Sequence, residues 1–344
     1  MEGINDMKLG WDVPFRYVFS GSLTMRMHDM LLDLSEFEPL DILVSQLDRN
    51  GVKQALKWKS EGFCRWMFVD SGAFSVHTGQ ANVTQQEYID YVNSIIDIAD
   101  IFAQLDTIPG KFGQPKSDQD YIDSAESSWE NFLHMRDEVK DKNKVMPVFH
   151  FGEDTKYLKR MLEYRDSSGE QLHYIGLSPA NDASVKARML YLKDMYDIIS
   201  QSSNPDVKTH VYGFTSLNAM SKFPCYSADS ISHRLISGYN KIVTQKFGII
   251  SITKRARTVK TKSNMSFLEL ADEYNVKALR DELDSLGVNL DLARKYGFEG
   301  DDILDWLPED NNIRVAISIR NIQILSQTKY KYAPTNLVVQ KKLF

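Results

Sequence analysis

Two aspartates stand out in this chain of 344 residues because each follows a short run of strand-like composition. Asp70 lies in "FVDSGAFS" (68–75), and Asp229 lies far along the chain in "CYSADSIS" (225–232). Paired carboxylates can support substitution at an anomeric carbon, because one attacks or stabilises that carbon while the other handles protons. The chain contains 47 Asp and Glu residues, so this pair has meaning only if the fold brings its members together.

The elements that must position these aspartates are short runs rich in β-branched and aromatic residues. They alternate with stretches of helical period, such as 84–99, 120–139 and 184–200. Strands that alternate with helices predict βαβ units and a parallel sheet. Eight strands over about 250 residues indicate a (β/α)8 TIM-type barrel, with a doubly wound open sheet as the alternative. The eight predicted strands are 16–21, 66–72, 100–106, 144–152, 173–178, 209–214, 224–230 and 247–252.

In a barrel, the carboxyl ends of the strands converge on one rim, where active sites lie. Most of the predicted strands end there in a polar or small residue: Asp70, Asp106, His150, Ser178, Gly213 and Asp229. Each of these alone could simply begin a loop or cap the next helix. As a set they predict a functional rim, with Asp70 on the second and Asp229 on the seventh strand.

The charge of the chain restricts how it could bind a polyanion. A net charge of -6 and a pI near 5.7 exclude a globally basic nucleic-acid coat. One short stretch, 253–262, is densely basic and could contact phosphates, although it could also be a solvated loop. Its basic residues are Lys254, Arg255, Arg257, Lys260 and Lys262. Helical patterns follow it, so we expect a catalytic barrel over 1–264 and a helical extension over 265–344.

The cysteines and the amino-terminal residues indicate a cytoplasmic protein. Cys64 and Cys225 are the only cysteines, which rules out a disulfide framework or a thiolate-rich metal site and fits a reducing compartment. The first residues lack the basic and apolar regions of a secretory leader, and no run of 18 apolar residues occurs. We therefore expect no membrane association. His77, His210 and His233 are too scattered to suggest a metal cluster.

Six segments carry a resemblance to a known family. "FVDSGAFS" is similar to the DSGGF-type motif of the tRNA-guanine transglycosylase (queuine tRNA-ribosyltransferase) superfamily, and most similar to the DSGAFS form of phage and bacterial relatives that insert 7-deazaguanines into DNA. The other segments follow in the family's order over about residues 15–250: "FAQLDTIPG", "PVFHFGE", "YIGLSPA", "VYGFTS" and "SADSISH". The resemblance implies a TIM-type barrel that exchanges one base for another.

The resemblance also implies a role for each matching residue. Asp229 would be the nucleophile that attacks C1′ of a guanosine, and Asp70 the general acid and base. Asp106 would accept hydrogen bonds from the N–H donors of the base. The base would further contact backbone N–H groups near Ser71, Gly72, Gly176 and Leu177, the ring of Phe74, and His150. Structural alternatives remain open, because Asp229 could cap a helix and Phe74 or His150 could be core residues.

Two departures from the family pattern matter. The tRNA enzymes hold a structural zinc through a cysteine-rich cluster that this chain lacks, so we expect neither that zinc subdomain nor any cofactor. His150 replaces the glutamine of the VQG-type segment and titrates near neutrality, which changes the expected base contacts.

These features predict an enzyme, a zinc-free guanine transglycosylase that places a free 7-deazaguanine base such as preQ0 into DNA through a covalent aspartyl–C1′ intermediate. DNA is preferred to tRNA because the zinc cluster is absent and the DSGAFS form is phage-like. The alternatives are a tRNA-guanine transglycosylase, a hydrolytic nucleosidase or glycosidase with the same carboxylates, and a non-catalytic barrel that binds nucleic acid or a deazapurine, with or without a partner protein.

Overall fold

The protein divides into two compact units. The computed structural model describes residues 15–111, 113–180, 183–216, 222–253 and 266–329. The first unit comprises Met1–Ser22, Leu40–Ser230 and Lys329–Phe344, and the second comprises Leu23–Pro39 and Ile231–Thr328. This division falls after residue 230, whereas the sequence pattern placed the domain boundary after residue 264.

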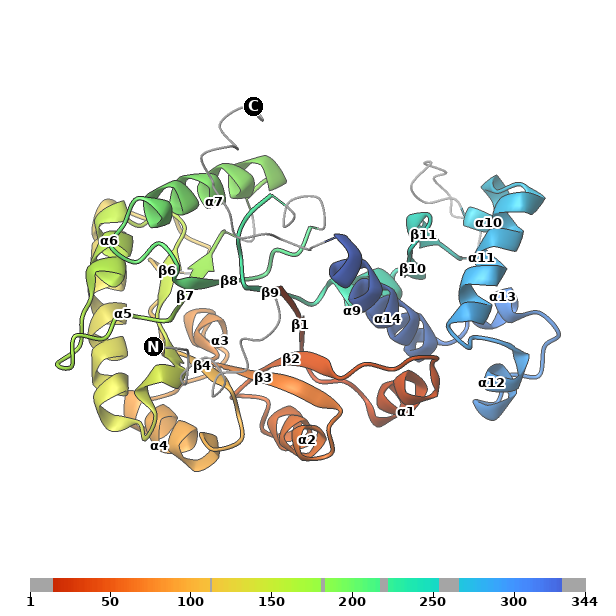
Figure 1. Ribbon diagram of the computed structural model, residues 1–344, viewed down its shortest axis with the longest axis horizontal. Helices are drawn as coiled ribbons and strands as arrows, with labels where there is room; N and C mark the ends of the chain where they lie inside the picture. Colours follow the sequence, from red (N-terminus) through yellow and green to blue (C-terminus); the bar gives the residue numbers. More distant parts are fainter. Residues whose placement is uncertain (1–14, 112, 181–182, 217–221, 254–265, 330–344) are drawn as a thin grey trace. The chain divides into compact units, whose positions relative to one another are not determined.

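The first unit is a mixed α/β structure built on a nine-stranded, parallel, nearly closed sheet (Figure 1). Its strands are β1 (Arg16–Ser20), β2 (Leu40–Ser45), β3 (Cys64–Asp70), β4 (Ile101–Ala103), β5 (Val145–Met146), β6 (Val148–His150), β7 (Tyr174–Ser178), β8 (Lys208–Val211) and β9 (Ser227–Ser230). The order across the sheet is β5-β4-β3-β2-β1-β9-β8-β7-β6. The two outer strands, β5 and β6, are separated in the chain only by Pro147. The two edges of the sheet therefore lie next to each other, and the sheet is nearly closed.

Two of the sequence-based strand assignments need correction. The strand β2 was not predicted, so Asp70 lies on the third strand and not on the second, and Asp229 lies on β9 and not on the seventh strand. The predicted strand 247–252 forms β11 (Gly248–Ser251), which pairs antiparallel with β10 (Lys241–Thr244) in a separate two-stranded sheet. An apolar run indicates a strand but does not identify its pairing partner, and here a tight turn at a left-handed Gly248 (φ 70°) favours the local hairpin.

Helices surround the parallel sheet of the first unit (Figure 1). They are α2 (Arg49–Ser60), α3 (Ala73–His77), α4 (Gln85–Ile95), α5 (Asp118–Glu138), α6 (Thr155–Glu163) and α7 (Val185–Ser200), with a 3-10 turn at Lys142–Lys144. Local sequence explains where two of them begin: Thr84 and Ser117 each form a capping box, with Glu87 and Asp120 respectively. Helical spacing then buries one face, as on α4, where Tyr88 and Val92 are buried.

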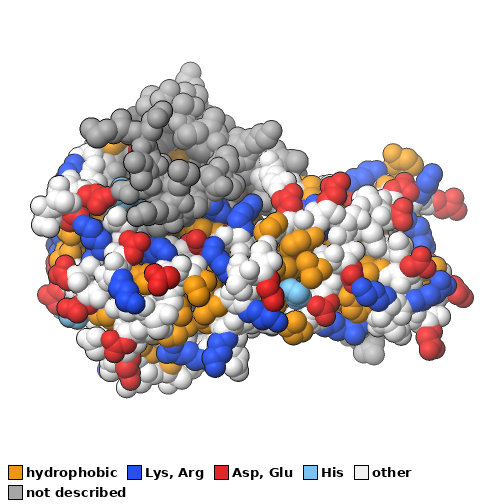
Figure 2. All heavy atoms as spheres, turned by 60° about the horizontal axis from the view of Figure 1, so that its bottom comes forward, with side chains coloured by type: hydrophobic (Ala, Val, Ile, Leu, Met, Phe, Trp, Pro, Cys, Tyr) orange, Lys and Arg blue, Asp and Glu red, His pale blue; other side chains and the backbone are white. Residues whose placement is uncertain are grey.

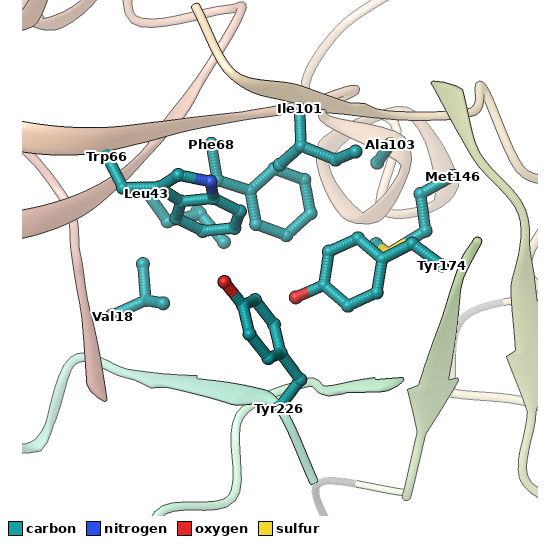
Figure 3. Close-up of a cluster of buried hydrophobic side chains, with 9 residues drawn as sticks. All are labelled: Val18, Leu43, Trp66, Phe68, Ile101, Ala103, Met146, Tyr174 and Tyr226. Atoms are coloured by element: carbon teal, nitrogen blue, oxygen red, sulfur yellow. The ribbon is translucent and has the colours of Figure 1, made fainter. Parts of the chain in front are cut away.

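Alternate residues of the strands fill the interior of the sheet. Figure 3 shows this cluster: Val18, Leu43, Trp66, Phe68, Ile101, Ala103, Met146, Tyr174 and Tyr226. At the amino end of the strands, Arg16 is 1% exposed and lies 3.1 Å from Asp41 Oδ1, which Arg65 also contacts. That end is therefore closed by packed aromatic rings and paired charges, which leaves the carboxyl end for a site.

The second unit is mainly helical. It contains α1 (Met25–Asp33), α9 (Ser232–Gly238), the β10–β11 hairpin, α10 (Phe267–Leu270), α11 (Glu273–Ser285), α12 (Leu290–Lys295), α13 (Ile303–Trp306) and α14 (Asn311–Lys329). Ion pairs connect its two chain segments: Arg26 with Asp310 at 2.7 Å, and Lys295 with Asp33 at 2.6 Å. The helices predicted after residue 265 are thus present. Among the described residues, no helix is both long and apolar enough to cross a bilayer.

Candidate active site

The carboxyl ends of the parallel strands hold the residues predicted for the rim. Asp70 ends β3, His150 ends β6 beside Ser178 of β7, and Asp229 lies in β9. Asp106 follows closely after the end of β4 at Ala103. Burial, together with the charges of Asp106 and Asp229, raises the pKa of Asp70. The structure therefore brings three aspartates from distant parts of the sequence into one electrostatic neighbourhood.

Asp229 is a buried carboxylate with three hydrogen-bond donors. Its Oδ1 accepts from His210 Nε2 at 3.2 Å and from the backbone N–H of Gly213 at 2.9 Å, and its Oδ2 accepts from the Ser20 hydroxyl. Burial by itself would raise the pKa of Asp229, but the hydrogen bond and charge of His210 and the other two donors outweigh burial and lower it. Asp229 is therefore held in its ionised form.

Asp70 has the opposite environment. Burial is the largest cause that raises its pKa to about 7, and the negative charge of Asp106 is the next. The N–H of Gly72 donates to Asp70 Oδ2 at 3.0 Å and only partly offsets this shift. Near neutral pH, Asp70 can therefore both hold and release a proton, which is the property of a general acid and base.

Asp106 lies between Ser71 and His150. Its Oδ2 is 2.8 Å from His150 Nε2, and its Oδ1 accepts from the Ser71 hydroxyl at 3.3 Å. Burial would lower the pKa of His150, but the nearby carboxylate of Asp106 and the charge of Glu153 raise it. Glu153, which is 7% exposed, also accepts the backbone N–H of His150 at 3.0 Å. His150 is thus part of the polar site and not a residue of the apolar core.

The turn after Asp70 depends on glycine. Gly72 has a left-handed backbone (φ 80°), and a Cβ there would lie 2.6 Å from Leu47 Cδ1 and 3.2 Å from Ser45 Oγ. This turn starts α3 and directs the Gly72 N–H to Asp70. The D-S-G sequence therefore supplies Asp70 and, through Gly72, also shapes the environment of its carboxylate.

The residues predicted to contact the base differ in burial and in hydrogen-bond partners. Ser71 is fully buried and bonded to Asp106, whereas Phe74 on α3 is 57% exposed. The backbone N–H of Gly176 itself donates to Pro147 O at 2.7 Å within the sheet. Leu177 is fully buried in the same strand. The Gly72 N–H is likewise engaged, with Asp70.

Sequence reasoning missed His210 as a partner of Asp229 and missed Tyr212 entirely. The Tyr212 hydroxyl is buried and has no hydrogen-bond partner among the described residues. Burial raises its pKa well above the ordinary value, and so do the charges of Asp70, Asp106 and Asp229, so the phenol stays neutral. The sequence "HVY" (210–212) could have indicated Tyr212, because residues two apart on a strand face the same side, which places Tyr212 on the side of His210.

Gly176 makes room for Tyr212. A Cβ at Gly176 would lie 2.8 Å from Cε2 of the Tyr212 ring and 3.3 Å from Met146 Cε. The ring also packs edge-on against His210, with centroids 4.6 Å apart. Gly176 therefore serves the site through its missing side chain rather than through its N–H.

The predicted phosphate contacts Lys254, Arg255, Arg257, Lys260 and Lys262 lie outside the described residues. On the face drawn in Figure 2, acidic and basic side chains of the described residues are interspersed. Within the described parts of the chain, no group of three or more His, Cys, Asp or Glu residues is arranged to hold a metal ion.

Comparison with known protein families and curated proteins does not identify the site. No family model matches this chain, and no curated protein matches it.

Proposed function

We propose that this protein is a base-exchange transglycosylase that replaces guanine in DNA with a 7-deazaguanine, through a covalent bond between Asp229 and C1′. The observation that carries the proposal is that two aspartates at the carboxyl end of one sheet have different surroundings: Asp229 accepts hydrogen bonds from His210, Gly213 and Ser20, which lower its pKa, whereas burial and the charge of Asp106 raise the pKa of Asp70 to about 7. A double displacement needs this combination of an ionised nucleophile and a proton carrier. The resemblance of the six sequence segments supports the same reaction.

We further propose that β5 and β6 act as one strand interrupted at Pro147, which makes the sheet an eight-stranded (β/α)8 barrel. Proline has no N–H to donate, which accounts for the interruption. The segment 145–150 pairs with β4 through Val145 and Met146 and with β7 through Val148 to His150. Asp70, Asp106 and Asp229 would then share the catalytic rim of the barrel.

The proposed reaction has two balanced halves. In the first, a carboxylate oxygen of Asp229 forms a bond with C1′, the C1′–N9 bond breaks, and guanine leaves with that electron pair and a proton from Asp70. In the second, Asp70 takes the N9 proton of the incoming base, N9 attacks C1′, and the ester bond returns its electron pair to Asp229. Asp106, positioned by His150 and Ser71, would accept hydrogen bonds from the N–H groups of the base.

The preference for DNA over tRNA rests on the DSGAFS form and on the missing cysteine cluster. In duplex DNA the target nucleoside must first leave the base stack, because C1′ is otherwise out of reach of the rim. The basic run at 254–262 would contribute contacts with phosphates that weaken as salt is added.

The test is base exchange with wild-type protein and the isosteric variant Asp229→Asn. Each is incubated with labelled guanine or preQ0 and with either duplex DNA or unmodified tRNA, and label in the washed nucleic acid is counted. We expect label in DNA with the wild type, and none with Asp229→Asn although it still binds DNA.

The other outcomes correct or reject the proposal. Label in tRNA alone moves the substrate and keeps the mechanism. Release of guanine without incorporation identifies a hydrolase. Exchange by Asp229→Asn at the wild-type rate rejects Asp229 as the nucleophile, and the absence of both exchange and release from the wild type rejects the proposed reaction.

A further inference from the structure

The two oxygens of Asp229 have different partners. Oδ1 accepts two N–H groups that the fold holds in place, from the ring of His210 on β8 and from the backbone of Gly213. Among the residues that the structure describes, Oδ2 accepts only the hydroxyl of Ser20, which can rotate about its C–O bond. Oδ2 is therefore the oxygen that can be freed without moving the backbone.

His210 is fixed from its other side. Its Nδ1 lies 2.6 Å from the Ser227 hydroxyl, which in turn contacts the hydroxyl of Tyr174. The imidazole is 0% exposed, and Phe68 and Tyr212 pack edge-on against it with centroids 4.8 and 4.6 Å away. Because an ionised carboxylate can only accept, the proton between His210 and Asp229 belongs to Nε2.

We infer that His210 is a positioning residue that holds Oδ1 of Asp229 as the future ester carbonyl and so leaves Oδ2 to attack the sugar. This inference rests on the proposed function and assigns the attacking atom within that reaction. His210 is fully buried and acts only through Asp229.

The two oxygens of Asp229 change differently during the proposed reaction. When Oδ2 bonds to C1′, the carboxylate becomes a neutral ester, and Oδ1 keeps its carbonyl character and its two donors. The Ser20 hydroxyl gives up its bond to Oδ2 as the C–O bond forms. In the second half-reaction the electron pair returns to the carboxylate, and the donors at Oδ1 stabilise the charge that develops there.

The experiment measures, with the full-length protein, the rate at which the adduct forms and the rate at which added guanine then breaks it down. His210→Phe keeps a ring and removes the donor, whereas His210→Gln keeps an amide N–H that can reach Oδ1. Adducts are trapped by acid quench and detected as a shift of protein mass on a denaturing gel. His173→Gln is the matched control. His173 Nε2 lies 2.8 Å from a carboxylate oxygen of Glu170, but the His173 side chain is 32% exposed, whereas His210 is buried.

We expect His210→Phe to slow the second half-reaction, in which negative charge returns to Asp229, by about 10²–10³-fold, as the loss of one preorganised donor typically does. His210→Gln should recover most of that loss, and His173→Gln should match the wild type. The affinity for free base should stay within about twofold, because His210 does not touch the base. A purely structural role would instead lower the folded fraction of both His210 variants alike, as measured by circular dichroism.

A second readout is independent of turnover. Nitrogen-15 NMR of histidine-labelled wild-type protein reports which ring nitrogens of His210 carry protons. A protonated Nε2 supports the inference, and a neutral ring protonated only at Nδ1 overturns it, even if neither variant folds. Breakdown of the adduct by added guanine at the wild-type rate in folded His210→Phe also overturns it. If the wild type itself forms no adduct with DNA or tRNA, the proposed function fails instead.

Discussion

Asp70 and Asp229 are neighbouring carboxylates whose protonation differs. Burial, and then the charges of Asp106 and Asp229, raise the pKa of Asp70 to about 7. Asp229 is buried too, but donors from His210, Ser20 and Gly213 lower its pKa. The difference arises from the hydrogen-bond donors and charges that surround each carboxylate and not from residue type.

The two half-reactions should depend on pH in opposite directions. In the proposed exchange, guanine release needs protonated Asp70, so its rate should fall as the pH rises above about 7. Entry of the new base into a preformed adduct needs ionised Asp70, so its rate should fall below the same pH. Single-turnover quench experiments on each half-reaction measure this. Parallel profiles for the two halves would contradict the role of Asp70.

The substitution Asp70→Asn should stabilise the protein at high pH. Between the ordinary value of 3.8 and about 7, the folded protein binds more protons at Asp70 than the unfolded chain does. The contribution of Asp70 to stability is therefore present below pH 3.8 and is lost as the pH rises through about 7. We expect Asp70→Asn to raise the free energy of unfolding by on the order of 1–3 kcal/mol at about pH 8, and by less at about pH 5.

Urea unfolding of wild type and variant at both pH values measures this difference. Asp291→Asn is the control, because that side chain is 95% exposed and its ion pair with Arg294 contributes little at either pH. A difference between wild type and Asp70→Asn that does not change with pH contradicts the assignment.

Removing the Tyr212 hydroxyl should also stabilise the fold. This hydroxyl is buried without a partner among the described residues, so Tyr212→Phe should raise the free energy of unfolding by about 1 kcal/mol. Tyr88→Phe is the matched control, because the Tyr88 hydroxyl donates to Ala103 O at 2.8 Å and its loss should destabilise the protein by a similar amount. Equal destabilisation of both variants would mean that the Tyr212 hydroxyl has a partner in solution. A more stable Tyr212→Phe protein that performs the proposed base exchange more slowly would indicate that the hydroxyl contacts the base or sugar.

Adding one methyl group at Gly176 should disturb the site. The new Cβ would meet the Tyr212 ring at 2.8 Å, so Gly176→Ala should lower the free energy of unfolding by about 1–3 kcal/mol. The cost should shrink when Tyr212 is also replaced by leucine, which a double-mutant cycle measures. Gly238→Ala, where no atom lies within 4 Å of the added Cβ, is the control and should change stability by about 0.5 kcal/mol or less. Equal effects of Gly176→Ala with and without the Tyr212 change would exclude the ring as the source of the clash.

Several features could be predicted from the sequence because they depend on local patterns. The alternation of strand-like and helical segments predicted a parallel α/β structure, and apolar residues three and four apart predicted the helices α4, α5 and α7. The positions of Asp70, Asp106 and Asp229 after strands predicted that they would lie at one end of the sheet. Parallel strands bring their carboxyl ends to the same edge, whatever the residues between them.

Other features depend on contacts between residues that are distant in sequence, and only the tertiary structure decided them. The sequence left β2 unrecognised and misplaced the partner of β11, because an apolar run does not encode which strand it pairs with. The donors around Asp229 come from β1, β8 and the loop after β8, so its lowered pKa follows from packing alone. Residue types and spacing thus determined which carboxylates could react, while burial and long-range hydrogen bonds decided which one is ionised.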